Sequence, residues 1–169
     1  MKKIVLWLAF IVGILALIGS CAKKDDESST AAATAFTPTT TASGSITVGS
    51  ATMSGTYASD CNDLTGSSAI GNYLPSDVLA NRDVLVVTGS DNVSEEMYMY
   101  TDTSCTNLSG YLKDGNDNFT VGDASGSNYK VTYVEATFKV TAVTSTAESF
   151  YESYFSTNNI TNQGTAVNL

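Results

Sequence analysis

The stretch YKVTYVEATFKVTAVT, residues 129–144, decides the fold of this chain. From residue 134 onward every second residue is apolar, which is the period of a β-strand with one buried and one solvated face. The predicted core face comprises Val134, Ala136, Phe138, Val140 and Ala142. The intervening residues, expected to face water, are Glu135, Thr137, Lys139 and Thr141. Upstream the apolar residues have the opposite parity, which predicts a bulge or strong bend near residue 133.

Short runs rich in Val, Ile, Tyr and Thr precede this stretch and are separated by Gly, Asn, Asp and Ser. This pattern is typical of an antiparallel β domain. The further expected strands are 45–48, 52–58, 83–88, 93–101, 109–113 and 118–121. Gly89-Ser90-Asp91-Asn92 is a strong turn signal, so the strands on either side of it should form a hairpin.

A helix is expected directly after the long strand. Ser145-Thr146-Ala147-Glu148 fits a capping box, in which the Ser145 and Glu148 side chains satisfy each other's backbone amides. The aromatic residues at 150, 151, 154 and 155 then form one stripe, which predicts that the helix docks on the sheet. A ligand platform is the other interpretation of this stripe. Residues 75–79 could form one more helical turn, and residues 159–169 an edge strand or a frayed end.

Composition narrows the function classes. The chain has 169 residues, a formal net charge of −9 and no His. The absence of His removes the commonest metal ligand and any Ser-His or Cys-His catalytic pair. The acidic balance argues against nucleic acid as a partner, because phosphates are bound through clustered Lys and Arg. With no P-loop, GxSxG or metal-binding Cys/His spacing, we expect no metal, no cofactor and no enzymatic activity.

The amino terminus has the layout of an export signal. Lys2 and Lys3 precede an apolar run over residues 4–18 that spans about 22 Å as a helix, too short for a bilayer core of roughly 30 Å. We therefore expect residues 1–20 to be cleaved as a signal peptide. Ile18-Gly19-Ser20-Cys21 resembles the lipobox of bacterial lipoproteins, which implies that Cys21 carries a lipid that anchors the protein to the membrane. The alternative is an ordinary signal peptide with a chance Cys at its end.

Residues 21–45 are expected to form a lipidated amino terminus and a flexible tether, because Ala, Ser and Thr dominate this segment. Residues 22–27, AKKDDE, resemble the short signal that sends some lipoproteins to the outer face of the outer membrane. A solvated charge cluster that only spaces the domain from the bilayer is the alternative. We expect a bacterial outer-membrane location, with surface exposure left open, and a β domain over residues 46–169.

Two further cysteines, Cys61 and Cys105, form an even pair in an exported and oxidising setting, so a disulfide is expected between them. Each follows a predicted strand within a similar acidic turn. The rival interpretation is a reactive thiol, which needs a nearby cation or His to lower its pKa. No basic residue lies within fifteen positions of Cys61, so the sequence favours the disulfide.

Residues 54–61, 98–105 and 119–122, together with the long strand, resemble a group of small bacterial lipoproteins that share these spacings. The similarity covers about residues 53–155. It implies a mainly β fold, a lipocalin-like antiparallel barrel or half-barrel with one C-terminal helix. It also implies the Cys61–Cys105 pairing, and it brings no established activity.

Few residues are candidates for chemistry. Asp114-Gly115-Asn116-Asp117-Asn118 is the densest oxygen cluster, but it lacks the EF-hand spacing and is interpreted as a tight β-turn rather than a Ca²⁺ site. Glu95 and Glu96 are adjacent strand positions that point to opposite faces, so they are poor candidates for an acid–base pair. Five tyrosines could line a cup for a small amphipathic ligand, or simply occupy half-buried strand positions: Tyr57, Tyr98, Tyr100, Tyr129 and Tyr133.

Two functions follow from these features. The first is a non-enzymatic cell-envelope lipoprotein whose β domain binds a small ligand or another partner. The second is a structural or adhesion lipoprotein that meets protein partners through strand edges. A closed barrel with a tyrosine-lined cavity would favour the first, and a filled core with exposed edges would favour the second.

Overall fold

A computed structural model describes residues 37–67, 73–126, 128–158 and 160. The strands are β1 (Ile46–Val48), β2 (Ala51–Met53), β3 (Thr56–Ala58), β4 (Asn62–Asp63), β5 (Ala80–Val87), β6 (Val93–Tyr100), β7 (Leu108–Ser125) and β8 (Asn128–Ala142), and the helix is α2 (Ser145–Thr157). In these ranges the protein is mainly β, and every strand pair is antiparallel. Cys21 and the predicted signal peptide lie outside the described residues.

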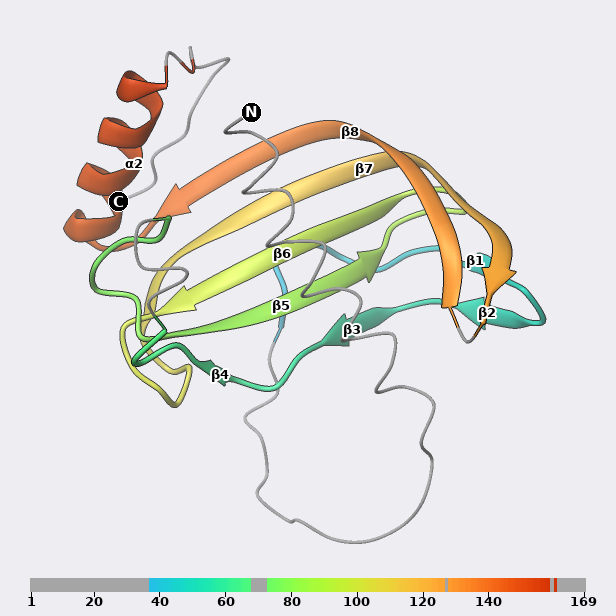
Figure 1. The fold of residues 1–169 in the computed structure, drawn as a ribbon, viewed down its shortest axis with the longest axis horizontal. Helices are drawn as coiled ribbons and strands as arrows, with labels where there is room; N and C mark the ends of the chain where they lie inside the picture. The colour runs from blue at the N-terminus through green and yellow to red at the C-terminus, as the bar shows by residue number, and fades with distance from the viewer. Residues whose placement is uncertain (1–36, 68–72, 127, 159, 161–169) are drawn as a thin grey trace, which may run out of the picture.

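The main sheet has the strand order β3-β5-β6-β7-β8, and β4 also pairs with β5. Figure 1 shows these strands as one curved layer, with the β1–β2 hairpin at one end and α2 at the other. Within the described ranges β3 and β8 are the two ends of the strand order, and no closed barrel is found. In the same ranges no helix is both long and apolar enough to cross a membrane.

The predicted hairpin at residues 89–92 is confirmed, because β5 and β6 pair from Val87 opposite Val93 onward. Other strand predictions were wrong in detail. The run 52–58 divides into β2 and β3, and Gly55 between them has a positive φ of 80°. The runs 109–113 and 118–121 belong to one strand, β7, so the acidic segment from Asp114 to Asn118 is not a turn. The register of β7 shifts after Asp117, and Asn118 adopts the left-handed backbone conformation there, with a φ of 54°.

A bulge was predicted near residue 133, and β8 has irregular register on both sides of that position. Gly115 pairs with Thr137 whereas the next residue of β7 pairs with Glu135, so Ala136 is the extra residue. One extra residue exchanges the two faces of a strand. Tyr133 therefore packs in the core, while Val134, predicted to be core, is 56% exposed. Phe138 is also largely exposed, and only Val140 and Ala142 of the predicted face join a core cluster.

The helix begins as predicted and docks on the sheet through its aromatic stripe, with Tyr151 buried against Met99. Its N-cap is Thr144 rather than Ser145. The Thr144 side chain accepts a hydrogen bond from the Ala147 amide at 3.1 Å. The predicted turn at residues 75–79 is present as a single turn, closed by a hydrogen bond from the Val78 amide to the Pro75 carbonyl.

The sheet carries core clusters on both faces. We call the face against which α2 packs the helix face. It holds a hairpin cluster, centred on Leu85, Val87, Val93 and Phe119 under the β1–β2 hairpin, and a helix cluster of Met99, Leu112, Ala142, Ala147 and Tyr151. We call the other side the tyrosine face, after the cluster formed by Val84, Val86, Tyr98 and Tyr100 with Tyr111 beside it.

Candidate functional site on the helix face

Four strands bring one row of side chains together at the middle of the helix face. In this row Leu85 of β5 lies opposite Glu95 of β6, Glu95 opposite Asp114 of β7, and Asp114 opposite Phe138 of β8. Residues directly opposite on antiparallel strands point to the same face with Cβ atoms about 4.5 to 5.5 Å apart. Glu95 and Asp114 are therefore a side-by-side pair of carboxyl groups.

This carboxyl pair has few partners. Glu95 is only 6% exposed, and no hydrogen bond or ion pair to its side chain is found among the described residues. Asp114 has one carboxyl oxygen, Oδ1, that is buried and also without a hydrogen-bond partner in that part of the chain. Burying a carboxylate without a partner is costly, so such a group holds its proton more tightly or takes up a cation.

Burial is the main cause that raises the pKa of Glu95 to about 7, and the negative charge of Asp114 adds to it. Burial likewise raises the pKa of Asp114 to about 7, with the Glu135 carboxylate as the second cause. Both carboxyls therefore hold their protons more tightly than an exposed carboxyl does.

The bulge at Ala136 adds two more groups to the surroundings of the pair. It turns both Tyr133 and Glu135 toward the helix face. Burial, followed by the charges of Glu95, Asp114 and Glu135, raises the pKa of Tyr133 to about 12. In the neighbouring row burial raises the pKa of Asp83, although the Asn81 amide donates a hydrogen bond to it at 3.1 Å.

Glu96, the next residue of β6, points to the tyrosine face and has a full set of partners. Its carboxylate accepts hydrogen bonds from the Thr39 and Thr40 hydroxyls and from the Tyr98 hydroxyl, and lies 3.8 Å from the Lys113 ammonium. Burial would raise the pKa of Glu96, but these hydrogen bonds and the Lys113 charge outweigh it, and the pKa is lowered. The described part of the predicted tether, from Thr37 onward, is thus bound to the sheet.

The five tyrosines of the predicted cup do not come together. Tyr98 and Tyr100 belong to the tyrosine face, while Tyr57 and Tyr133 pack against the hairpin cluster on the helix face. Tyr129 is 40% exposed, and its hydroxyl lies against Gly49 in the β1–β2 turn, where there is no room for a Cβ. Their placement matches the simpler interpretation, in which Tyr occupies half-buried strand positions.

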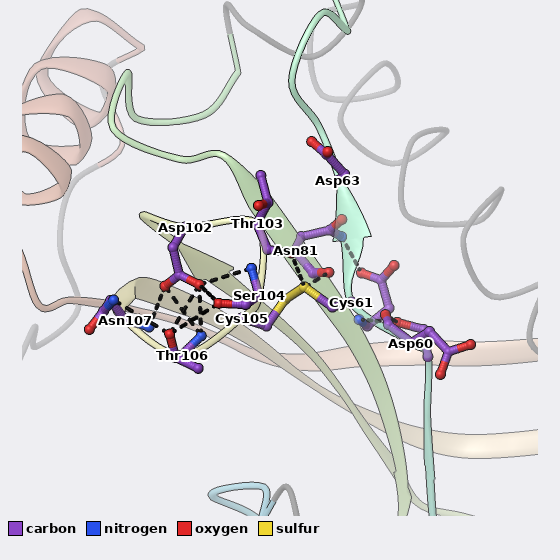
Figure 2. Close-up of a disulfide and its surroundings, with 12 residues drawn as sticks. Asp60, Cys61, Asp63, Asn81, Asp102, Thr103, Ser104, Cys105, Thr106 and Asn107 are labelled. Atoms are coloured by element: carbon purple, nitrogen blue, oxygen red, sulfur yellow. Dashed lines mark hydrogen bonds between the residues drawn. A yellow bond between two sulfur atoms is a disulfide. The ribbon is translucent and has the colours of Figure 1, made fainter. Parts of the chain in front are cut away.

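The predicted disulfide between Cys61 and Cys105 is present, with 5.8 Å between the two Cα atoms. Figure 2 shows that it joins the segment before β4 to the β6–β7 loop. Asp102 organises that loop by accepting hydrogen bonds from the backbone amides of Ser104 at 2.9 Å and Asn107 at 2.6 Å. Hydrogen bonds from Ser104, and then from Asn107 and Thr106, lower the pKa of Asp102. Because both sulfurs are in the bond, neither cysteine is a free thiol in this structure, as the disulfide interpretation predicted.

Sequence reasoning missed the carboxyl pair because it placed Asp114 in a turn and compared Glu95 only with Glu96. A signal was nevertheless present. Glu95 occupies the same parity as Val93 and Met97, so it interrupts an apolar row that faces the core. Within the described ranges no three His, Cys, Asp or Glu are grouped so that they could hold a metal ion. No family model, no curated protein and no solved structure matches this chain.

Proposed function

We propose that this chain is a lipid-anchored protein of the bacterial cell envelope whose open, half-barrel sheet is a non-enzymatic binding module. In this proposal residues 1–20 direct export, Cys21 carries the lipid, and the segment up to Thr37 spaces the domain from the outer membrane. The lipobox and the apolar run before it support the anchor. The disulfide supports an oxidising compartment such as the envelope.

One observation carries the binding role. The helix face keeps the buried Glu95 and the half-buried Asp114 side by side between two apolar clusters. Neither the Glu95 carboxyl nor the buried Oδ1 of Asp114 has a hydrogen-bond partner among the described residues. A domain that only needed a stable core would gain from apolar side chains there, because unpaired buried carboxyls oppose folding. Such residues fit a site that is completed by a ligand.

Two linked measurements test this function. The full chain and a Cys21→Ser variant are expressed in a Gram-negative host and fractionated, and the membrane-bound protein is analysed by intact mass spectrometry. We expect acyl groups on Cys21, loss of the variant from membranes, and a co-purified small molecule released from the wild-type protein on unfolding. A variant that still partitions with membranes would refute the anchor, and a protein that never carries a ligand would refute the binding role.

The exposed strand β8 favours a second candidate function, a structural or adhesion protein with a protein partner. This strand has 15 residues, ends the described strand order, and exposes the apolar side chains of Val131, Val134 and Phe138. An unpaired edge of this kind can add a strand from another chain. A Val131→Lys/Val134→Lys variant should then lose self-association or partner capture in cross-linking, while its melting temperature stays unchanged.

A further inference from the structure

The helix face has an unbalanced charge. Four carboxyl-bearing residues face this side of the sheet in the described part of the chain: Asp83, Glu95, Asp114 and Glu135. The basic residues of the same strand segments alternate with them and therefore point to the tyrosine face, where Lys113 is paired with Glu96. Lys130 lies beyond the bulges, beside Gly122 near the β7–β8 turn. In these paired strand segments the register thus places the carboxylates on the helix face and the Lys113 ammonium on the tyrosine face, beside Glu96.

The lack of a partner is sharpest at the centre of the row. Glu95 is more than nine-tenths buried and unpaired, and the buried Oδ1 of Asp114 also lacks a donor, both among the described residues. Two acceptors on adjacent strands match a group that offers several N–H donors and a positive charge, which is the geometry of an ammonium or amidinium group.

The surroundings of the pair are apolar and aromatic. Leu85 lies on one side of Glu95 in the row, and Phe138 lies on the other side of Asp114 with 44% of its surface exposed. Leu112 of the helix cluster occupies the next position of β7 on the same face. An aromatic ring beside an anionic pair favours a cation further, and exposed apolar surface favours an apolar body attached to it.

We propose that Glu95 and Asp114 bind the cationic nitrogen of an amphiphilic organic amine or amidine, whose apolar part lies along Phe138 and the edge of the helix cluster. This inference rests on the proposed binding function and names the chemical class of its ligand. A bare metal ion fits less well, because no three metal-ligating side chains are grouped in the described ranges.

The affinity should depend on pH. The titratable groups that face Glu95 are Asp114 from β7, Asp83 from the neighbouring β5, and Tyr133 and Glu135 from β8. Because burial raises the pKa of Glu95 and of Asp114 to about 7, the pair is protonated in the free protein in mildly acidic solution. A cation competes with those protons, so its binding should strengthen as the pH rises from 6 to 8.

The test uses three probes with the same apolar chain: octylammonium, octanol and octanoate. Each is titrated at pH 8 into the ¹⁵N-labelled full chain, and binding is followed by calorimetry and by amide chemical shifts. We expect octylammonium to bind at least about tenfold more tightly than the other two and to shift amides around residues 95 and 114. A Glu95→Gln/Asp114→Asn variant should lose at least about tenfold of the octylammonium affinity.

The matched control is Asp123→Asn, which removes a carboxylate from an exposed position of the same strand and should bind like wild type. Circular dichroism checks that the double variant folds, which we expect because it removes repulsion between the pair. Equal binding of octylammonium to the double variant and wild type would overturn the inference. Equal binding of octanol and octylammonium would also overturn it while supporting a binding face for neutral ligands. If none of the three probes bound, the inference about the ligand class would be overturned. The proposed binding function would still stand or fall on the search for a co-purified ligand.

Discussion

Glu95 and Glu96 are consecutive residues at the middle of β6, both almost fully buried, yet their surroundings differ in every other respect. Glu96 has hydroxyl donors and an ammonium group, and its pKa is lowered. Glu95 faces another carboxyl, and its pKa is raised to about 7. Successive side chains of a β-strand point to opposite faces of the sheet, so these two carboxylates have different neighbours. A buried carboxylate stabilises the fold where donors surround it and destabilises the fold where another carboxyl does.

The largest effect should come from the disulfide, which lies beside the cluster of the tyrosine face through Cys105. In a Cys61→Ser/Cys105→Ser variant we expect a loss of about 4 kcal/mol in the free energy of unfolding, because a loop of 44 residues is no longer closed in the unfolded chain. Urea unfolding measures the loss. A loss below about 1 kcal/mol would contradict a stabilising role of this bond.

The second effect concerns the partners of Glu96. Glu96→Ala should lower the free energy of unfolding by about 3 kcal/mol, because it leaves Lys113 and the surrounding hydroxyls without their buried acceptor. Urea unfolding at pH 7 measures the change. Asp123→Asn is the control for net charge and should stay within about 0.5 kcal/mol of wild type. A small effect of Glu96→Ala would show that the segment at Thr39 and Thr40 contributes little to stability.

The third variant should raise the free energy of unfolding, whereas the first two lower it. Glu95→Gln should raise the free energy of unfolding at pH 8 by on the order of 2 kcal/mol, since a raised pKa means that the charged form opposes folding. The contribution of Glu95 is fully present below its ordinary pKa of 4.5 and is lost as the pH rises through about 7. Glu96 behaves inversely, because its lowered pKa gives stability above 4.5 that is lost as the pH falls.

Urea midpoints between pH 4 and pH 8 separate these two glutamates. The wild-type midpoint should fall between pH 5 and pH 7.5, and Glu95→Gln should flatten that part of the curve. An unchanged slope in the variant would mean that Glu95 does not titrate in this range.

The smallest effect tests the bulge in β8. Val134→Thr should change the free energy of unfolding by less than about 0.5 kcal/mol, because the bulge turns Val134 out to solvent. Val140→Thr is the matched variant on the same strand, and its half-buried side chain in the helix cluster should make it about 1 kcal/mol more costly. Equal costs for the two variants would place Val134 back on the core face.

The elements with strong local signals could be predicted from the sequence. The turn at residues 89–92, the helix with its aromatic stripe and the Cys61–Cys105 link are present where they were expected. Each depends on residues close in sequence or on one pairing of two cysteines. The cap at Thr144, one residue before the expected Ser145, reflects two neighbouring hydroxyls that suit the same role.

The carboxyl site could not be predicted, because it depends on register between distant strands. A turn at Asp114 was a reasonable local interpretation, but pairing with β6 and β8 holds this segment extended. The bulge was foreseen near residue 133, yet its place at Ala136 decides which side chains turn inward. Moving it by a few residues would have kept Val134 in the core and Glu135 in water, as the simple alternation predicted.

The hydrogen bonds of Thr39 and Thr40 to Glu96 have a mechanical consequence. They fasten the chain to the centre of the sheet, at a middle strand, and not to either edge. A force applied to the preceding segment would therefore act first on β6 and then on β5 and β7 through their hydrogen bonds. Because Thr39 and Thr40 precede β1, this force would not reach the short strands β1 to β4 directly.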